Sequence, residues 1–195
     1  MRHVLRLSVL LAASLLSARA AAEQGAWSMA QLMQSLSQVK AASSRFVERK
    51  TLHMLSEPLI ASGTLRYVAP DEVEKLTLSP ERERLVVKGD SLTFEGGSGG
   101  QSRIMSLAAN PEIAAIVEGI RATLAGDLAT LDRFYLVRLS GNAGDWQLSL
   151  VPKQPAVKKF IASIRIAGAG NAIKSVATTE TDGDYSDMSI VETTR

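Results

Sequence analysis

The chain has 195 residues, of which 46% are hydrophobic and 22% are charged, and it carries a formal charge of +2 with no cysteine. The absence of cysteine excludes disulfides, thiolate metal sites, a cysteine nucleophile and a lipid-modified N-terminal cysteine. The length suits one domain with a substantial core.

The first 22 residues have the features of a secretory signal peptide. Arg2 and Arg6 give a basic start, residues 7–16 are an apolar run too short for a stable membrane anchor, and the small residues within 18–22 fit the cleavage rule. We therefore expect a cleaved signal peptide at 1–22 and a single mature domain at 23–195. A retained anchor is the alternative.

Loss of this leader changes the charge balance of the chain. Arg2, Arg6 and Arg19 leave with it, so 19 Lys and Arg remain against 20 Asp and Glu. The mature chain then has no basic excess, and we expect no nucleic-acid partner. No other run resembles a transmembrane helix. We expect an exported monomer in the periplasm.

The mature chain begins with a helix and continues as strands. Met29, Leu32, Met33 and Leu36 have helical spacing, which predicts a helix over 29–41 with Ser28 as its N-cap. Alternation and turn residues then predict strands at 43–55, 59–68, 73–79, 84–87 and 91–95. The connections are short, which favours an antiparallel meander in chain order.

A glycine-rich loop at 96–100 interrupts this meander, and residues 104–107 lead from it into a helical region. The loop lacks the Gly-Lys-Ser/Thr of a phosphate cradle. Asn110 and Pro111 predict the start of a helix that ends near Gly126, and Asp127 predicts the cap of a shorter helix. Five more strands are expected at 134–139, 146–151, 161–167, 173–179 and 185–191.

The sequence contains no catalytic constellation. Because His3 lies in the leader, a triad or a histidine metal site would depend on His53 alone. Asp182-Gly183-Asp184 lacks the remaining ligands of a calcium loop. We expect no catalytic residues, no metal, no cofactor and no enzymatic activity; a hydrolase that uses His53 is a minor alternative.

Four segments carry a resemblance to a known family. Residues 46–50 (Phe-Val-Glu-Arg-Lys) resemble a "Phe-x-Gln/Glu" first strand, and residues 63–70 resemble a "Gly-x-Leu-x-x-x-x-Pro" hairpin. Residues 85–94 resemble a turn before "x-Leu-x-Phe", and residues 180–185 resemble a late hairpin. In this order, over most of the mature chain, they resemble the LolA-type outer-membrane lipoprotein carrier proteins.

The resemblance implies an α+β fold: a single curved antiparallel sheet forming an unclosed half-barrel, with a leading helix and a helical lid over the concave face. It implies a carrier that takes an acylated lipoprotein or other lipid cargo from an inner-membrane donor protein to an outer-membrane acceptor protein. The expected cavity residues are Leu65, Tyr67, Leu76, Leu78, Leu85, Val87, Leu92 and Phe94 on the sheet, and Ile113, Ile116, Val117 and Ile120 on the lid.

Two alternatives stay open at this point. Alternation shows which residues share a face, but an ordinary core has the same pattern as a ligand-binding face. The same half-barrel could also serve as a periplasmic sensor or scaffold that binds a protein partner.

One departure from the family is Ala69, which stands before Pro70. Many such carriers have an arginine at this position that ties the lid to the sheet. With alanine here, the cargo could be a glycolipid or another acyl-linked lipid.

Overall fold

The computed structural model describes residues 27–96 and 101–192. The signal peptide predicted at 1–22 and residues 97–100 of the predicted glycine-rich loop lie outside these described residues. Within them, no helix is long and apolar enough to cross a membrane.

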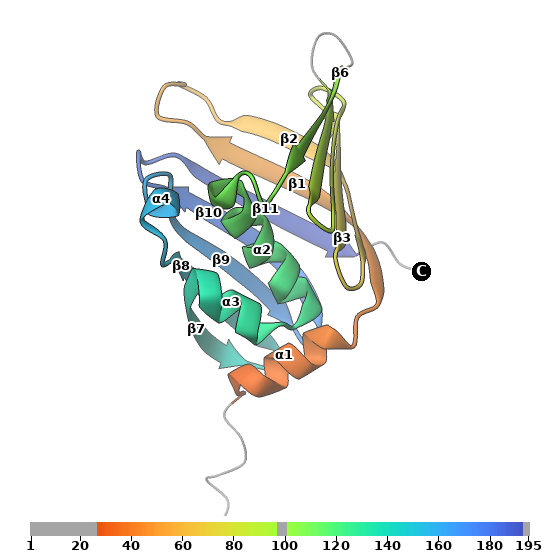
Figure 1. Ribbon diagram of the computed structural model, residues 1–195, viewed down its shortest axis with the longest axis vertical. Coiled ribbons are helices and arrows are strands. Elements are labelled where there is room, and N and C mark those ends of the chain that lie inside the picture. The colour runs from red at the N-terminus through yellow and green to blue at the C-terminus, as the bar shows by residue number, and fades with distance from the viewer. Residues whose placement is uncertain (1–26, 97–100, 193–195) are drawn as a thin grey trace, which may run out of the picture.

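A single antiparallel sheet of 11 strands dominates the fold (Figure 1). Its strands follow the spatial order β6-β5-β4-β3-β2-β1-β11-β10-β9-β8-β7. The bounds are β1 Ala41–Thr51, β2 Leu59–Val68, β3 Glu72–Ser79, β4 Glu83–Lys88, β5 Ser91–Gly96, β6 Gln101–Ser106, β7 Tyr135–Asn142, β8 Asp145–Pro152, β9 Ile161–Ala169, β10 Ala172–Glu180 and β11 Tyr185–Glu192. The first strand pairs with the last at the centre, so β6 and β7 from mid-chain form the two edges.

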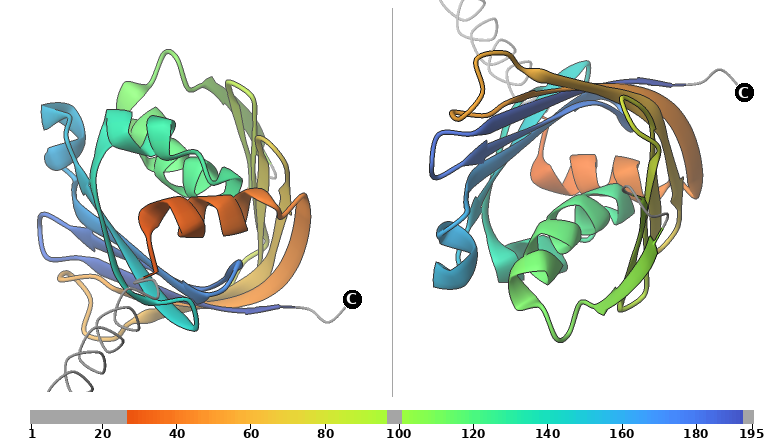
Figure 2. Two further views of the ribbon diagram at one scale, coloured as in Figure 1. Left: turned by 90° about the horizontal axis from the view of Figure 1, so that it is seen from below. Right: turned by 90° about the horizontal axis from the view of Figure 1, so that it is seen from above.

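Four helices accompany the sheet: α1 Met29–Ser37, α2 Pro111–Ala125, α3 Leu128–Phe134 and α4 Pro155–Lys158. Figure 2 shows α1, α2 and α3 within the curve of the sheet, whereas α4 lies beside its margin. Ser28 and Gln31 form a capping box that starts α1, and the side chain of Asp127 accepts the backbone N–H of Thr130 at the start of α3. The predicted unclosed antiparallel half-barrel with helices over its concave face is therefore confirmed.

The main core lies between the helices and the β7–β10 part of the sheet. In β8, Trp146, Leu148 and Leu150 are fully buried while Gln147 between them is exposed. The indole N–H of Trp146 donates to the carbonyl of Gly170 at 2.9 Å, so burial of this ring leaves no unpaired donor. Alternation on such strands presents one apolar face to the helices.

A second, smaller cluster lies on the other side of α2. Its buried members are Val87, Leu92 and Leu107, and half-buried residues of β3–β6 and α2 pack against them. Ile113, Ala114 and Val117 of α2 contact this small cluster, whereas Ala115 and Ala122 belong to the main core. Helix α2 therefore bridges two hydrophobic clusters of unequal size.

Several predicted boundaries are corrected by the structure. The predicted helix over 29–41 ends at Ser37, and the strand predicted at 43–55 runs over Ala41–Thr51. The lead-in predicted at 104–107 overlaps the edge strand β6, which pairs with β5 along its length. Its outward Ile104 is 73% exposed, so the strand lacks the buried alternation by which strands are predicted. The connection between the strands predicted at 146–151 and 161–167 contains the short helix α4.

Candidate functional site

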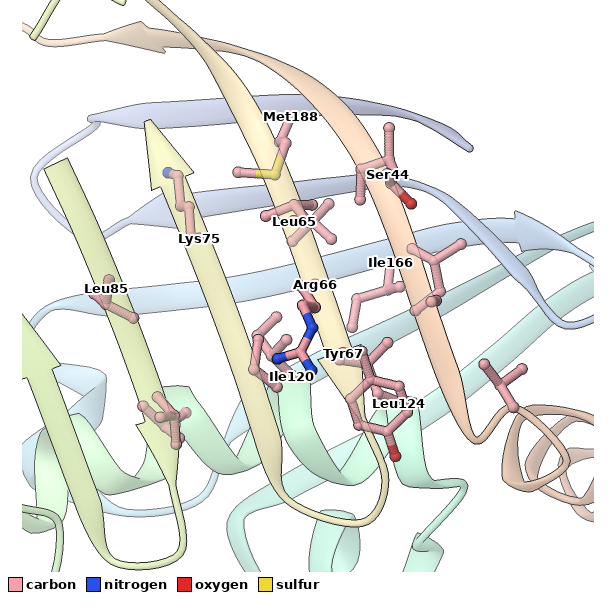
Figure 3. A pocket seen from close by; sticks show the side chains of 18 of the residues that line it. Ser44, Leu65, Arg66, Tyr67, Lys75, Leu85, Ile120, Leu124, Ile166 and Met188 are labelled. Atoms are coloured by element: carbon pink, nitrogen blue, oxygen red, sulfur yellow. The ribbon is translucent and has the colours of Figure 1, made fainter. Parts of the chain in front are cut away.

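A cavity of about 1120 Å³ lies between the concave face of the sheet and α1 and α2 (Figure 3). Its helical wall is formed by Leu36 of α1 and by Ile113, Ile116, Val117, Ile120 and Leu124 of α2, and Val39 in the connection between α1 and β1 also lines it. Its sheet wall is formed by residues 41–44 together with Leu65, Arg66, Tyr67, Val73, Lys75, Leu85, Val87, Leu92, Ile166, Asn171, Ile173, Val176, Met188 and Ile190. The lining is mostly aliphatic, so the cavity suits an apolar ligand.

Strand register explains which residues reach this cavity. Tyr67 pairs with Val73, Val73 with Val87, and Val87 with Leu92, which gives one inward row across four strands. The next inward row contains Leu65, Lys75 and Leu85. Paired residues in an antiparallel sheet point to the same face, so both rows line the cavity.

The structure brings most of the predicted cavity residues together at this one cavity. They are Leu65, Tyr67, Leu85, Val87 and Leu92 on the sheet, and Ile113, Ile116, Val117 and Ile120 on α2. Several also contribute to the hydrophobic clusters, so these residues both pack the protein and face the cavity.

Leu76, Leu78 and Phe94 are not among the lining residues of the cavity, which corrects their assignment to it. Leu76 pairs with Thr64 and Arg84 in the outward row, and Leu78 is 50% exposed. A one-residue offset in β3 moves every side chain to the other face. Phe94 shares the inward row of Leu85 but lies beyond the cavity wall.

A polar group borders the cavity that sequence analysis did not predict. Lys75 donates to Oε2 of the buried Glu48 at 2.5 Å, and the hydroxyl of Ser186 donates to Oε1 at 2.7 Å. Burial raises the pKa of Glu48, but hydrogen bonds from Lys75 and Ser186 and the charges of Lys75 and Lys50 outweigh it, so the pKa lies below its usual value. Glu48 lies two residues after the buried Phe46, and this spacing was the available signal that it points inward.

Arg121 on α2 ties this helix to the sheet. Its guanidinium donates to the carbonyl oxygen of Gly89 at 2.7 Å, in the turn between β4 and β5, and it also pairs with Glu118. Ala69 bonds through its backbone N–H to the carbonyl of Lys40. The lid-to-sheet bond is thus supplied by an arginine on the helix, and we call the contact between Arg121 and Gly89 the latch.

The other side of α2 is attached to strand β7. The buried hydroxyl of Tyr135 donates to the carbonyl of Ala115 at 2.7 Å, and burial raises the pKa of Tyr135. A Cβ at Gly119 would lie 2.9 Å from that hydroxyl oxygen, so α2 approaches the ring closely at a glycine. The helix is therefore bonded to β7 on one side and to the β4–β5 turn on the other.

His53 lies on the surface, away from the cavity lining. Its backbone N–H and its Nδ1 both contact Oδ1 of Asp184 at 2.7 Å. Hydrogen bonding and the negative charge of Asp184 raise the pKa of His53. Asp182 lies close enough that the three side chains could meet at a cation, but Asp182 is already bonded to the backbone of Asp184.

Residues 20–192 match the family model described as "Outer membrane lipoprotein carrier protein LolA-like". A search of the curated proteins found no match.

Solved structures with a similar fold share little sequence with this chain. The LolA superfamily protein NE2245 from Nitrosomonas europaea is 9% identical, with 85% of this chain and 92% of that chain covered and a TM-score of 0.41. A putative outer membrane lipoprotein-sorting protein domain from Vibrio parahaemolyticus is 11% identical, with 83% and 88% covered and a TM-score of 0.42. MucB of the Pseudomonas aeruginosa MucA/MucB complex is 12% identical, with 83% and 55% covered and a TM-score of 0.44.

Proposed function

Because the chain belongs to the LolA-like family of outer membrane lipoprotein carrier proteins, as its sequence motifs predicted, we propose that it is a periplasmic carrier for acylated cargo. In this proposal the leader at 1–22 directs export. The cavity shields the acyl chains of a lipoprotein or another envelope lipid between an inner-membrane donor and an outer-membrane acceptor. The observation that carries the proposal is the aliphatic cavity of about 1120 Å³ beneath α2.

The energetics of acyl chains support a shielded route. Each methylene group exposed to water costs roughly 0.8 kcal/mol, so a chain of about 15 methylenes costs roughly 12 kcal/mol. The cavity volume of about 1120 Å³ lies just above the roughly 300–1,000 Å³ that is typical of small-molecule sites. A cavity of this size suits one or more acyl chains.

In our proposal, cargo enters when α2 separates from part of the sheet. The small cluster around Val87, Leu92 and Leu107 holds one side of α2, and the latch adds one charged hydrogen bond there. The other side is held by the larger core and by Tyr135. In our proposal α2 stays with β7 and the main core, and β3–β6 move away from it.

Binding of a long-chain fluorescent fatty acid to the delipidated protein tests the proposed function. We expect saturable binding without turnover, displacement by unlabelled long-chain amphiphiles, and solubilisation of an acylated lipoprotein. A purified, folded protein that binds no long-chain amphiphile and solubilises no lipoprotein would contradict the carrier function.

Loss of the latch is expected to accelerate cargo exchange. Arg121→Met removes the charged hydrogen bond to Gly89, which corresponds to about a tenfold faster release of a bound acyl probe. The measurement is the dissociation rate by stopped-flow fluorescence. Because Glu118 would lose its partner, the comparison is made in a Glu118→Gln background, where only the latch differs. Equal dissociation rates in Glu118→Gln and in the double variant Glu118→Gln with Arg121→Met would show that the latch does not limit opening.

The second candidate is a sensor or scaffold that binds a protein partner. It is favoured by β6, a sheet edge with a hydrophobic side chain, Ile104, that is 73% exposed. An unpaired edge strand can accept a strand from a partner. If an Ile104→Lys variant binds the acyl probe and delivers cargo as the wild type does, the exposed edge of β6 is not needed for the carrier function. Partner binding at that edge would then be a separate activity.

A further inference from the structure

Lys75 is a feature that shielding of an acyl chain alone does not require. Among the described residues, Lys75 and Arg66 are the charged members of an otherwise apolar and small-polar cavity lining. Arg66 is half-exposed and donates to Glu72 at 2.5 Å. The side chain of Lys75 is 27% exposed and lies in the inward row between Leu65 and Leu85.

On β3 and β4, Lys75 stands at the end of the cavity lining. Its own row, with Leu65 and Leu85, lines the cavity, whereas Thr77 and Glu83 of the next inward row do not. On β11, Ile190 and Met188 continue the lining past this row. In the opposite direction along these strands the wall is formed by Tyr67, Val73, Val87 and Leu92, and the helical wall is formed by aliphatic residues of α1 and α2. On these two strands the cavity therefore ends at a cation, and apart from Arg66 the rest of its lining is uncharged and mostly apolar (Figure 3).

The cation is held in place from behind. Glu48 binds Lys75 at 2.5 Å and is itself fixed by Ser186, with Nζ of Lys50 3.8 Å from its Oε1. The ring of Phe46 lies 5.0 Å from Nζ of Lys75. An ammonium group has three N–H donors, and the contact with Glu48 uses one of them. The side chain is thus positioned before any ligand arrives, with donors left for one.

We propose that the cavity selects an acyl amphiphile with a single anionic oxygen head group, a carboxylate or a phosphate, which Lys75 binds. This inference rests on the proposed carrier function of the same cavity. The head group lies at the Lys75 end, and the tail extends along the apolar wall towards α1. A charge-assisted hydrogen bond is strong in such an apolar site, and a neutral glyceride head group cannot form one of equal strength.

The pair of Glu48 and Lys75 determines how this proposal is tested. Lys75→Met alone would leave the buried Glu48 with only the more distant and more exposed Lys50 as counterion, which destabilises the fold for a reason unrelated to cargo. The informative variant is the double substitution Glu48→Gln with Lys75→Met, which removes both charges and retains the shapes. Glu48→Gln alone and Lys75→Arg are the matched controls, because both keep a cation at the cavity end.

The experiment measures displacement of a neutral fluorescent acyl probe by oleate, oleyl phosphate and oleyl alcohol in mildly alkaline buffer. We expect wild type and both controls to bind at least one anionic amphiphile about tenfold more tightly than the alcohol. We expect the double variant to lose this preference while still binding the alcohol. Melting temperatures confirm that each variant is folded, and whichever of oleate and oleyl phosphate is preferred identifies the head group.

Two outcomes would overturn the inference by different routes. Equal affinity of wild type for all three amphiphiles, or a preference that survives in the folded double variant, would overturn the role of Lys75 and leave the carrier function standing. Failure of wild type to bind the probe or any of the three would overturn the carrier function and the inference with it. If the double variant does not fold, the inference is judged from Lys75→Arg and from the affinities of the wild type for oleate and for the alcohol.

Discussion

Ser44→Trp is expected to weaken acyl-probe binding by more than tenfold while the protein remains folded. Ser44 lies on β1 opposite Leu65 and lines the cavity, so an indole at this position occupies the space in which we propose that cargo binds (Figure 3). If the indole displaces only about two methylene groups of the ligand, the loss of about 1.6 kcal/mol lowers affinity by more than tenfold. The measurement is titration with a fluorescent fatty acid, together with thermal melting. The cavity has room for the ring, so we expect little loss of stability.

Val47→Trp is the matched control for this substitution. Val47 lies on the same strand, but it points to the other face of the sheet and is 54% exposed. It should leave acyl-probe binding unchanged, because its ring points away from the cavity. Unchanged binding by a folded Ser44→Trp protein would mean that cargo is held outside this cavity.

Gly126→Ala is expected to cost the largest share of stability among single substitutions at the helices. Gly126 ends α2 with a φ of +68°, and a Cβ there would lie 2.1 Å from the carbonyl oxygen of Met33 and 2.9 Å from the backbone nitrogen of Ser37. A left-handed conformation costs a non-glycine residue roughly 1–2 kcal/mol, and the clash with α1 adds roughly 1–3 kcal/mol. We expect the free energy of unfolding, measured by urea denaturation, to fall by about 2–5 kcal/mol.

Gly170→Ala separates the two causes of this loss. Gly170 has a φ of +55°, but a Cβ there would meet nothing within 4 Å. It should therefore lose only the roughly 1–2 kcal/mol due to the left-handed conformation. If Gly126→Ala loses no more than Gly170→Ala, the backbone of α1 adjusts to the added methyl group, and the joint between α1 and α2 is looser than its close approach indicates.

Local sequence signals predicted most of the fold, because turn and cap residues placed the ends of the elements where the spacing of apolar residues also placed them. Pro58 and Pro70 flank β2, which runs over Leu59–Val68 as predicted. Gly89 has the positive φ that its hairpin turn requires, and α2 begins at Pro111 and ends before Gly126 as its cap residues indicated. The edge strand β6 escaped prediction because pairing with β5, rather than its own composition, makes it a strand.

The site was less predictable than the fold, because side-chain direction on β3 depends on its neighbours. The assumption that apolar residues point inward selected Leu76 and Leu78, whereas register with β2 and β4 places Lys75 inward. The partners of long-range polar contacts could not be read from one sequence either. Lys75 with Glu48, and Arg121 with Gly89, are separated by 27 and 32 residues and meet only after the sheet has curved.

The unequal clusters on the two sides of α2 set a minimum length for a useful tail. Separation of α2 from the small cluster would return the side chains of Val87, Leu92 and Leu107 to water, at roughly 1.5–3 kcal/mol each. At roughly 0.8 kcal/mol per methylene, about six to eleven methylene groups must enter the protein to offset that exposure. If the protein carries acyl cargo as we propose, short-chain amphiphiles fall below this threshold, and we expect the protein to discriminate against them by energy rather than by shape.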